Sequence, residues 1–143
     1  MEKNLIIMLI LFVIILGAAT IWIVDLQQTE KQVLQFNKTF EDYKDKISLG
    51  SEVATLINKA IDNNEKKQIN KNDKGIYQDD GKYSVQVFVR LEKDGDLFSM
   101  ERINALKITE FVKNFSLQDF KCTGIEYHKE TKRVSKIYFE AIE

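Results

Sequence analysis

Residues 5–24 read LIIMLILFVIILGAATIWIV, a run without a single charged side chain. As an α-helix this run extends about 30 Å, the thickness of the hydrocarbon core of a bilayer. Trp22 lies near its far end, where an indole suits the headgroup boundary. We therefore expect residues 1–24 to form an N-terminal transmembrane anchor, with its flanks marked by Leu5, Trp22 and Val24.

A cleaved signal peptide is the alternative, with the small residues Gly17, Ala18 and Ala19 as its cleavage site. Residues 21–24 continue the apolar run past that site, which favours the anchor. Lys3 and the α-amino group place the positive charge before the helix, so the positive-inside rule predicts a cytoplasmic N-terminus. We expect a single-pass plasma-membrane protein with an extracytoplasmic C-terminal domain.

Composition excludes several classes of function. The net charge is −1, and it stays −1 when Glu2 and Lys3 are removed with the anchor, so nucleic acid is not an expected partner. Cys122 is the only cysteine, which excludes an intrachain disulfide, and we expect it to be buried. His128 is the only histidine, which excludes a multi-histidine zinc site, and we expect it to be exposed. The absence of proline and the many Lys and Asn residues are typical of an AT-rich bacterial genome.

The sequence after the apolar run predicts that the helix continues through residues 25–47 with one apolar face. Apolar side chains recur there at the spacing of a heptad, although Thr29 interrupts the stripe. This face packs either against the protein's own sheet or against an identical or related helix in an assembly. The candidate interface consists of Leu26, Val33, Phe36, Phe40 and Tyr43.

The remaining chain predicts a single small α+β domain within residues 25–143. A second helix is expected over residues 51–66, after a turn in which Gly50 takes a positive φ and Ser51 caps the helix. A polar loop follows over Gln68–Lys82. Residues 83–143 then predict a hairpin, a helix and a second hairpin. Within this last part we expect strands over 83–92, 97–103, 120–128 and 134–142, and a helix that starts at Asn104.

Together these elements predict a four-stranded, mostly antiparallel sheet packed against helices on one face. The fold class is therefore α+β, with an N-terminal transmembrane helix that extends into an amphipathic helix.

No motif predicts catalysis or cofactor binding. Asn70–Gly75 resembles a calcium loop, but Lys74 occupies a ligand position and Gly81 stands where the bidentate glutamate belongs. We therefore expect a polar surface loop, and a turn at Asp79–Gly81. The sequence predicts no catalytic, cofactor-binding or metal-binding residues, and hence a protein that is not an enzyme.

An apolar helix that continues into an amphipathic one, followed by a small antiparallel sheet, resembles the layout of type IV pilins and pseudopilins. That resemblance implies a filament-forming apolar half and an amphipathic half that lies against a globular head. The chain departs from the family motif, because no glutamate follows a basic leader ending in glycine; five residues beyond Gly17 stands Trp22.

Two functions are expected from this layout. The first is a non-enzymatic subunit of the bacterial envelope, acting in assembly or interaction as an accessory of a pilus-like, secretion or transfer apparatus. Its partners would be the lipid bilayer, further copies of itself, or other envelope proteins bound through the amphipathic helix. The second is a membrane-tethered ligand-binding or sensory module, which would recognise its ligand through residues 68–82 and 93–96.

Overall fold

The computed structural model describes residues 2–92 and 95–142, apart from the side chains of residues 2, 24, 25 and 28. The chain divides into two compact units, Met1–Gln35 and Phe36–Glu143. The boundary lies eleven residues after the end of the expected anchor because the last turns of the first helix pack with the domain.

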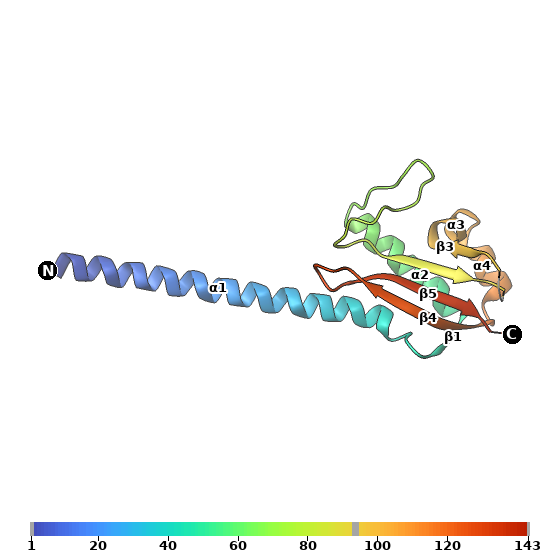
Figure 1. Ribbon diagram of the computed structural model, residues 1–143, viewed down its shortest axis with the longest axis horizontal. Helices are drawn as coiled ribbons and strands as arrows, with labels where there is room; N and C mark the ends of the chain where they lie inside the picture. The colour runs from blue at the N-terminus through green and yellow to red at the C-terminus, as the bar shows by residue number, and fades with distance from the viewer. Residues whose placement is uncertain (1, 93–94, 143) are drawn as a thin grey trace. The chain divides into compact units, whose positions relative to one another are not determined.

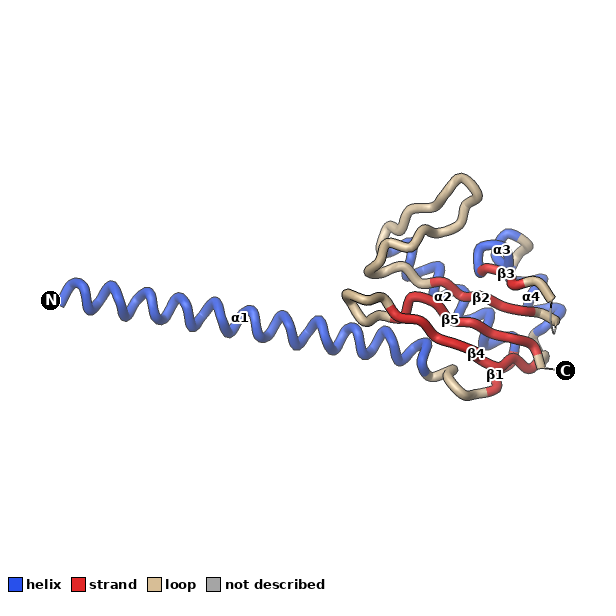
Figure 2. The backbone as a smooth tube through the Cα atoms, viewed as in Figure 1, coloured by secondary structure: helices blue, strands red, loops and turns tan. Residues whose placement is uncertain are grey.

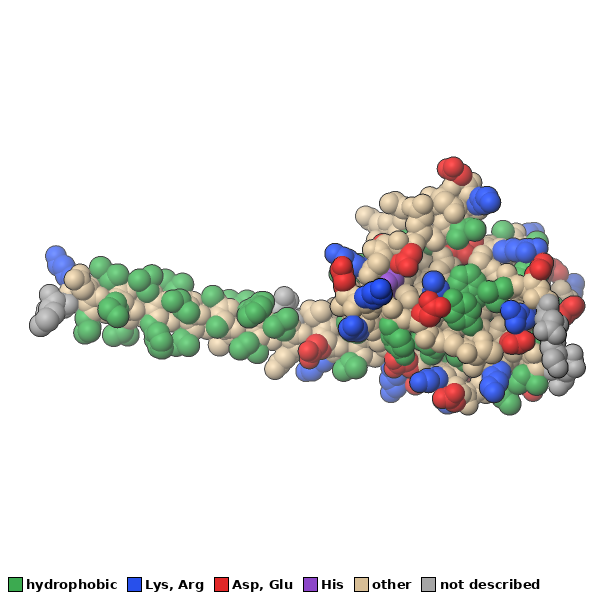
Figure 3. Space-filling model, viewed as in Figure 1, with side chains coloured by type: hydrophobic (Ala, Val, Ile, Leu, Met, Phe, Trp, Pro, Cys, Tyr) green, Lys and Arg blue, Asp and Glu red, His purple; other side chains and the backbone are tan. Residues whose placement is uncertain are grey.

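The N-terminal unit consists of most of helix α1 (Glu2–Glu41). Its segment Lys3–Ile23 is long and apolar enough to cross a membrane, in agreement with the sequence prediction. Leu5 and Trp22 are 65% and 68% exposed, and apolar side chains cover this part of the helix (Figure 3). The side chain of Val24 lies outside the described residues. The helix ends at Glu41, earlier than the predicted end at residue 47.

The C-terminal unit is built on a mixed five-stranded sheet with the strand order β1-β4-β5-β2-β3 (Figure 1). All neighbouring strands are antiparallel except β2 and β5, which are parallel. The sequence predicted four of these five strands. It missed β1, because a strand of three residues is too short to show alternating apolar and polar side chains. The strands are β1 (Ile47–Leu49), β2 (Gln86–Arg90), β3 (Leu97–Ser99), β4 (Asp119–Tyr127) and β5 (Val134–Ala141).

The two central strands alternate between a covered and an open face. Val87 and Val89 on β2, and Ile137 and Phe139 on β5, are fully or almost fully buried. The residues between them point to the other side of the sheet because side chains alternate along a strand. This alternation follows the prediction for residues 83–92 and 134–142.

The helices lie behind the sheet in the views of Figures 1 and 2 and cover one of its faces. They are α2 (Gly50–Lys66), α3 (Met100–Ala105) and α4 (Ile108–Phe115). The predicted single helix from Asn104 is wrong, because Ser99 ends β3 and accepts a hydrogen bond from the backbone N–H of Arg102 as the N-cap of α3. The chain then turns before α4.

The turn before α2 also differs from the prediction. Leu49, not Ser51, is the N-cap, and its backbone N–H donates to Glu52 Oε2 at 2.8 Å. Gly50 is buried in the first turn of α2, whereas the described glycines with positive φ are Gly75 and Gly81. A Cβ atom at Gly50 would run into the backbone carbonyl of Phe115, so close packing explains this glycine.

Part of the predicted helix stripe belongs to the core of the C-terminal unit. Phe40 is 1% exposed, and Phe36 and Tyr43 pack against the same core. The Tyr43 ring meets Phe139 edge-on at a centroid distance of 5.8 Å. For these three residues the face packs on the protein's own sheet, which was the first of the two alternatives.

Candidate functional site: a histidine–aspartate cluster and a neighbouring cleft

The first candidate site is formed where the loop before β2 meets the turn after β4. Asp80 Oδ1 accepts hydrogen bonds from the backbone N–H groups of Lys82, Tyr83 and Ser84, at 3.0, 2.7 and 2.8 Å. Desolvation raises the pKa of Asp80, but these hydrogen bonds outweigh it and lower the pKa to about 2. The carboxylate therefore fixes the turn that was predicted at Asp79–Gly81.

His128 is buried at this position, and the prediction of an exposed histidine is wrong. Its side chain is 2% exposed. Nε2 lies 2.7 Å from the carbonyl oxygen of Ser84, while the backbone N–H of His128 donates to the carbonyl of Arg133 at 2.8 Å. A carbonyl oxygen can only accept, so Nε2 carries a proton.

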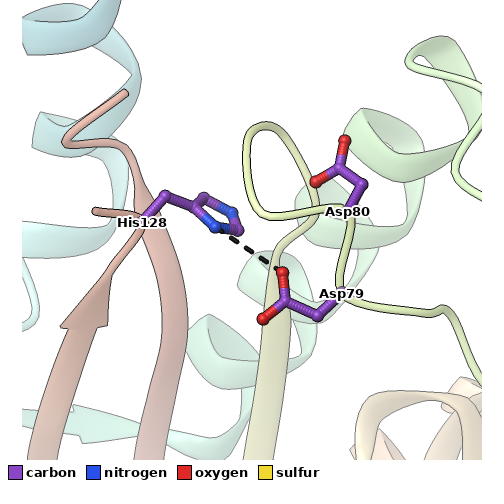
Figure 4. A group of neighbouring side chains, drawn as sticks. All are labelled: Asp79, Asp80 and His128. Atoms are coloured by element: carbon purple, nitrogen blue, oxygen red, sulfur yellow. Dashed lines mark ion pairs between the residues drawn. The ribbon is translucent and has the colours of Figure 1, made fainter. Parts of the chain in front are cut away.

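The other ring nitrogen of His128 faces an aspartate. Its Nδ1 lies 3.6 Å from Oδ1 of Asp79, which makes an ion pair when the imidazole is protonated (Figure 4). Asp79 Oδ1 also accepts from the backbone N–H of Gly81 at 2.8 Å and from Ser84 Oγ at 3.2 Å. Asp79, Asp80 and His128 each offer one ligand atom, and these atoms lie within 4.8 Å of one another.

The second candidate site is a cleft of about 680 Å³ between the loop before β2 and the β3–α3 segment. Tyr77 and Phe88 contribute aromatic walls, and Glu101 contributes a carboxylate. Lys71 and Arg102 also line it, each held over an aromatic ring: Lys71 Nζ is 4.4 Å from the Tyr77 centroid, and the Arg102 guanidinium carbon is 4.2 Å from that of Phe98.

Glu101 is held in the cleft by one of its two oxygens. Oε1 accepts from the backbone N–H of Tyr77 at 3.1 Å and from Gln86 Nε2 at 2.8 Å. Glu101 Oε2 and Gln86 Oε1 are both buried and have no hydrogen-bond partner among the described residues. Buried acceptors without a donor are costly, so this pair favours an occupant that donates N–H groups.

The open face of the sheet continues from this cleft. Phe88 on β2 stacks on Tyr138 of the parallel strand β5, with centroids 5.2 Å apart and an angle of 13° between the rings. Arg90 pairs with Glu140 at 3.6 Å beside them. Figure 3 shows a hydrophobic patch surrounded by charged side chains on this face of the domain.

The remaining sequence-predicted residues are placed as follows. Leu26 is 48% exposed and Val33 is half-buried, so their assignment to a helix interface stays a prediction. Cys122 is 7% exposed, which confirms its predicted burial, and that burial raises the pKa of its thiol. In the loop that resembles a calcium site, Asn72 Oδ1 accepts from the backbone N–H groups of Lys74 and Ile76, as expected of a polar turn. Of the predicted hairpin tip, Lys93 and Asp94 lie outside the described residues.

The sequence did not predict that His128 lies beside Asp79, or that Glu101 contacts Gln86. The partners in each pair come from separate elements, and neither pair has a characteristic spacing. No protein-family model matches the chain, no curated protein matches its sequence, and no solved structure matches its fold.

Proposed function

We propose that this chain is a non-enzymatic, single-pass membrane protein of the bacterial envelope that acts as an interaction subunit. Its helix through Ile23 would anchor it in the plasma membrane, and its C-terminal domain would meet the partner outside the cytoplasm. The resemblance to pilins and pseudopilins suggests an accessory role in a pilus-like, secretion or transfer apparatus. The apolar segment Lys3–Ile23 supports the membrane anchoring.

The observation that carries the interaction role is a buried carboxylate oxygen in the aromatic cleft that has no donor among the described residues. Glu101, whose Oε2 is this oxygen, lines the cleft with Tyr77 and Phe88, and Gln86, whose Oε1 is likewise buried without a donor, contacts Glu101. Lys71, Lys74 and Arg102 also line the cleft, but Lys71 and Arg102 lie over the rings of Tyr77 and Phe98. The unpaired oxygen of Glu101 and the ring of Phe88 are the groups that favour a cationic N–H donor. The occupant is therefore a lysine or arginine side chain from a segment of an envelope protein, which would rest on the Phe88–Tyr138 stack.

Photo-cross-linking in native cells tests this proposal. A photoreactive residue at Leu97, which lines the cleft and is 43% exposed, should give an adduct that maps to a lysine- or arginine-containing segment of the partner. The same residue at Thr55, on the exposed side of α2, is the matched control. Glu101→Gln keeps an acceptor for Tyr77 and Gln86 but removes the charge, so it should abolish the adduct at Leu97.

Equal adducts at Leu97 and Thr55, or an adduct that Glu101→Gln leaves unchanged, would contradict the proposed cleft. A ladder of adducts between copies of this chain from a probe at Leu26 or Val33, without any at Leu97, would instead place assembly on the helix. Probes at those two positions are informative because neither belongs to the core of the domain.

A ligand-binding or sensory module is the second candidate function. The cleft volume of about 680 Å³ favours it, because small-molecule sites fall within roughly 300–1,000 Å³. Its occupant would be a small primary amine. A panel of biogenic amines and basic amino acids should then raise the melting temperature of the full chain in detergent, and Glu101→Gln should remove the effect.

A further inference from the structure

We propose that His128, Asp79 and Asp80 form a binding site for a divalent cation of the zinc class, separate from the cleft. The three side chains come from the loop before β2 and from the residue that follows β4. Figure 4 shows the imidazole directed at the Asp79 carboxylate. This site goes beyond the proposed function and does not depend on it.

The argument begins with the proton on His128. Nε2 must donate to the carbonyl of Ser84, 2.7 Å away, so in a neutral ring Nδ1 carries a lone pair. That lone pair faces Asp79 Oδ1 at 3.6 Å, and a carboxylate oxygen is also an acceptor. The imidazole is 2% exposed and Asp79 is 61% exposed, so a cation bound between these two acceptors would be reached from the solvent side.

The geometry favours a metal ion. The 3.6 Å separation is longer than a charge-assisted N–H···O hydrogen bond, which is about 2.7–2.9 Å. Two ligand atoms about 2.1 Å from a tetrahedral zinc ion lie about 3.4 Å apart. A metal-binding histidine also commonly donates its other N–H to a backbone carbonyl, as His128 does to Ser84.

The ligand chemistry selects the metal. One imidazole nitrogen and two carboxylates suit zinc and related transition-metal ions, whereas calcium prefers oxygen ligands alone. Asp79 Oδ1, the oxygen that faces Nδ1, also accepts the hydrogen bonds of Gly81 and Ser84, so a metal ion would share this oxygen with the turn, and Asp80 would provide the third ligand. Three protein ligands leave a fourth position for water, so we expect weaker binding than at a closed structural zinc site.

A metal at this site would fasten the loop before β2 to the residue after β4. The same loop provides Lys71 and Tyr77 to the cleft. Metal binding would therefore restrict the motion of the loop end nearest β2. Because Tyr77 belongs to that loop, the wall of the cleft that it forms would be restricted as well.

The test uses the full chain in detergent micelles, purified with a tag that contains no histidine. Because His128 is the only histidine, the imidazole nitrogens give one pair of ¹⁵N signals. Zn²⁺ should shift the Nδ1 signal, leave the Nε2 proton in place, and bind at a 1:1 ratio in isothermal titration calorimetry. It should also raise the melting temperature by several degrees, and Ca²⁺ should not.

Two variants separate metal binding from folding. His128→Gln retains an amide N–H for the carbonyl of Ser84 but removes the Nδ1 lone pair, and Asp79→Asn retains an acceptor for Gly81 and Ser84 but removes the charge. Each should weaken Zn²⁺ binding at least tenfold. Asp73→Asn, in the loop that resembles a calcium site, is the control and should bind as the wild type does.

Three results would overturn the proposal. The first is a His128 ring with protons on both nitrogens at pH 7.5 that Zn²⁺ does not change, since the cation between His128 and Asp79 would then be a proton. The second is Zn²⁺ binding that survives both His128→Gln and Asp79→Asn. The third is a wild-type protein that shows neither heat of binding nor a shift in melting temperature with Zn²⁺.

Discussion

Asn37 on α1 closes the hairpin between β4 and β5 by accepting a hydrogen bond from the backbone N–H of Val134 at 2.8 Å. Its side-chain amide also donates to the carbonyl of Lys132 at 2.8 Å. Asn37 is 7% exposed, although it lies 97 positions from Val134 in the sequence. A single amide therefore joins the end of α1 to the two residues that flank Arg133.

The first prediction concerns this amide. Asn37→Ala should lower the free energy of unfolding of the domain by about 2 kcal/mol, because it leaves the buried N–H of Val134 and the partly buried carbonyl of Lys132 without this partner. Urea denaturation of the full chain in detergent, followed by circular dichroism, measures the change. Lys38→Ala alters the exposed neighbour and should cost less than about 0.5 kcal/mol. Equal losses in both variants would contradict the role of Asn37.

The second prediction separates core from surface along α1. Phe40 is 1% exposed, so Phe40→Ala should destabilise the domain by about 3–5 kcal/mol through loss of apolar contact and a residual cavity. Leu34 is 68% exposed, and Leu34→Ala should change the stability of the domain by less than about 0.5 kcal/mol. The same denaturation experiment compares the two. If the Phe40→Ala domain unfolds like the wild type, Phe40 does not stabilise the core and is again a candidate residue of an assembly interface.

Much of the fold could be predicted because its signals are local. The apolar positions of α2 recur at helical spacing, and β5 alternates between buried and half-buried residues, so the element type is present in each short window. The charge-free run before Val24 is likewise a local signal. These elements lie within a few residues of their predicted bounds.

The missing parts depend on contacts between distant residues. β1 has three residues and exists because it pairs with β4, whose residues are more than 65 positions away. The parallel pairing of β2 and β5 leaves no trace in either strand, since alternation is the same for both directions. His128 follows a strand and precedes a polar turn, which indicates exposure, but the loop with Ser84 covers it.

The third prediction tests the close approach at the start of α2. Gly50→Ala places a Cβ atom against the backbone carbonyl of Phe115, which cannot move without shifting α4. We expect the domain to lose about 1–3 kcal/mol of stability, despite the better helix propensity of alanine. At Gly17 nothing lies within 4 Å of the added Cβ, so Gly17→Ala is the matched control and should leave the unfolding of the domain unchanged. Thermal melts of both variants in the same detergent decide the matter, and a Gly50→Ala melt at or above the wild-type temperature would refute the steric explanation.

The fourth prediction follows from the turn that Asp80 holds. The pKa of Asp80 is lowered to about 2 in the folded chain, because hydrogen bonds from the backbone of Ser84, Tyr83 and Lys82 outweigh desolvation. A lowered pKa means that the folded state favours the carboxylate, so this contribution to stability is complete above the ordinary pKa of 3.8 and is lost as the pH falls toward 2. Asp80→Asn keeps an acceptor but cannot titrate. The difference in melting temperature between wild type and Asp80→Asn should therefore be constant above about pH 5 and shrink between about pH 4 and pH 2.

Asp80→Ala removes the acceptor as well and should melt below Asp80→Asn at neutral pH. A wild-type advantage over Asp80→Asn that persists unchanged at pH 2 would show that the backbone hydrogen bonds do not depend on the charge of Asp80.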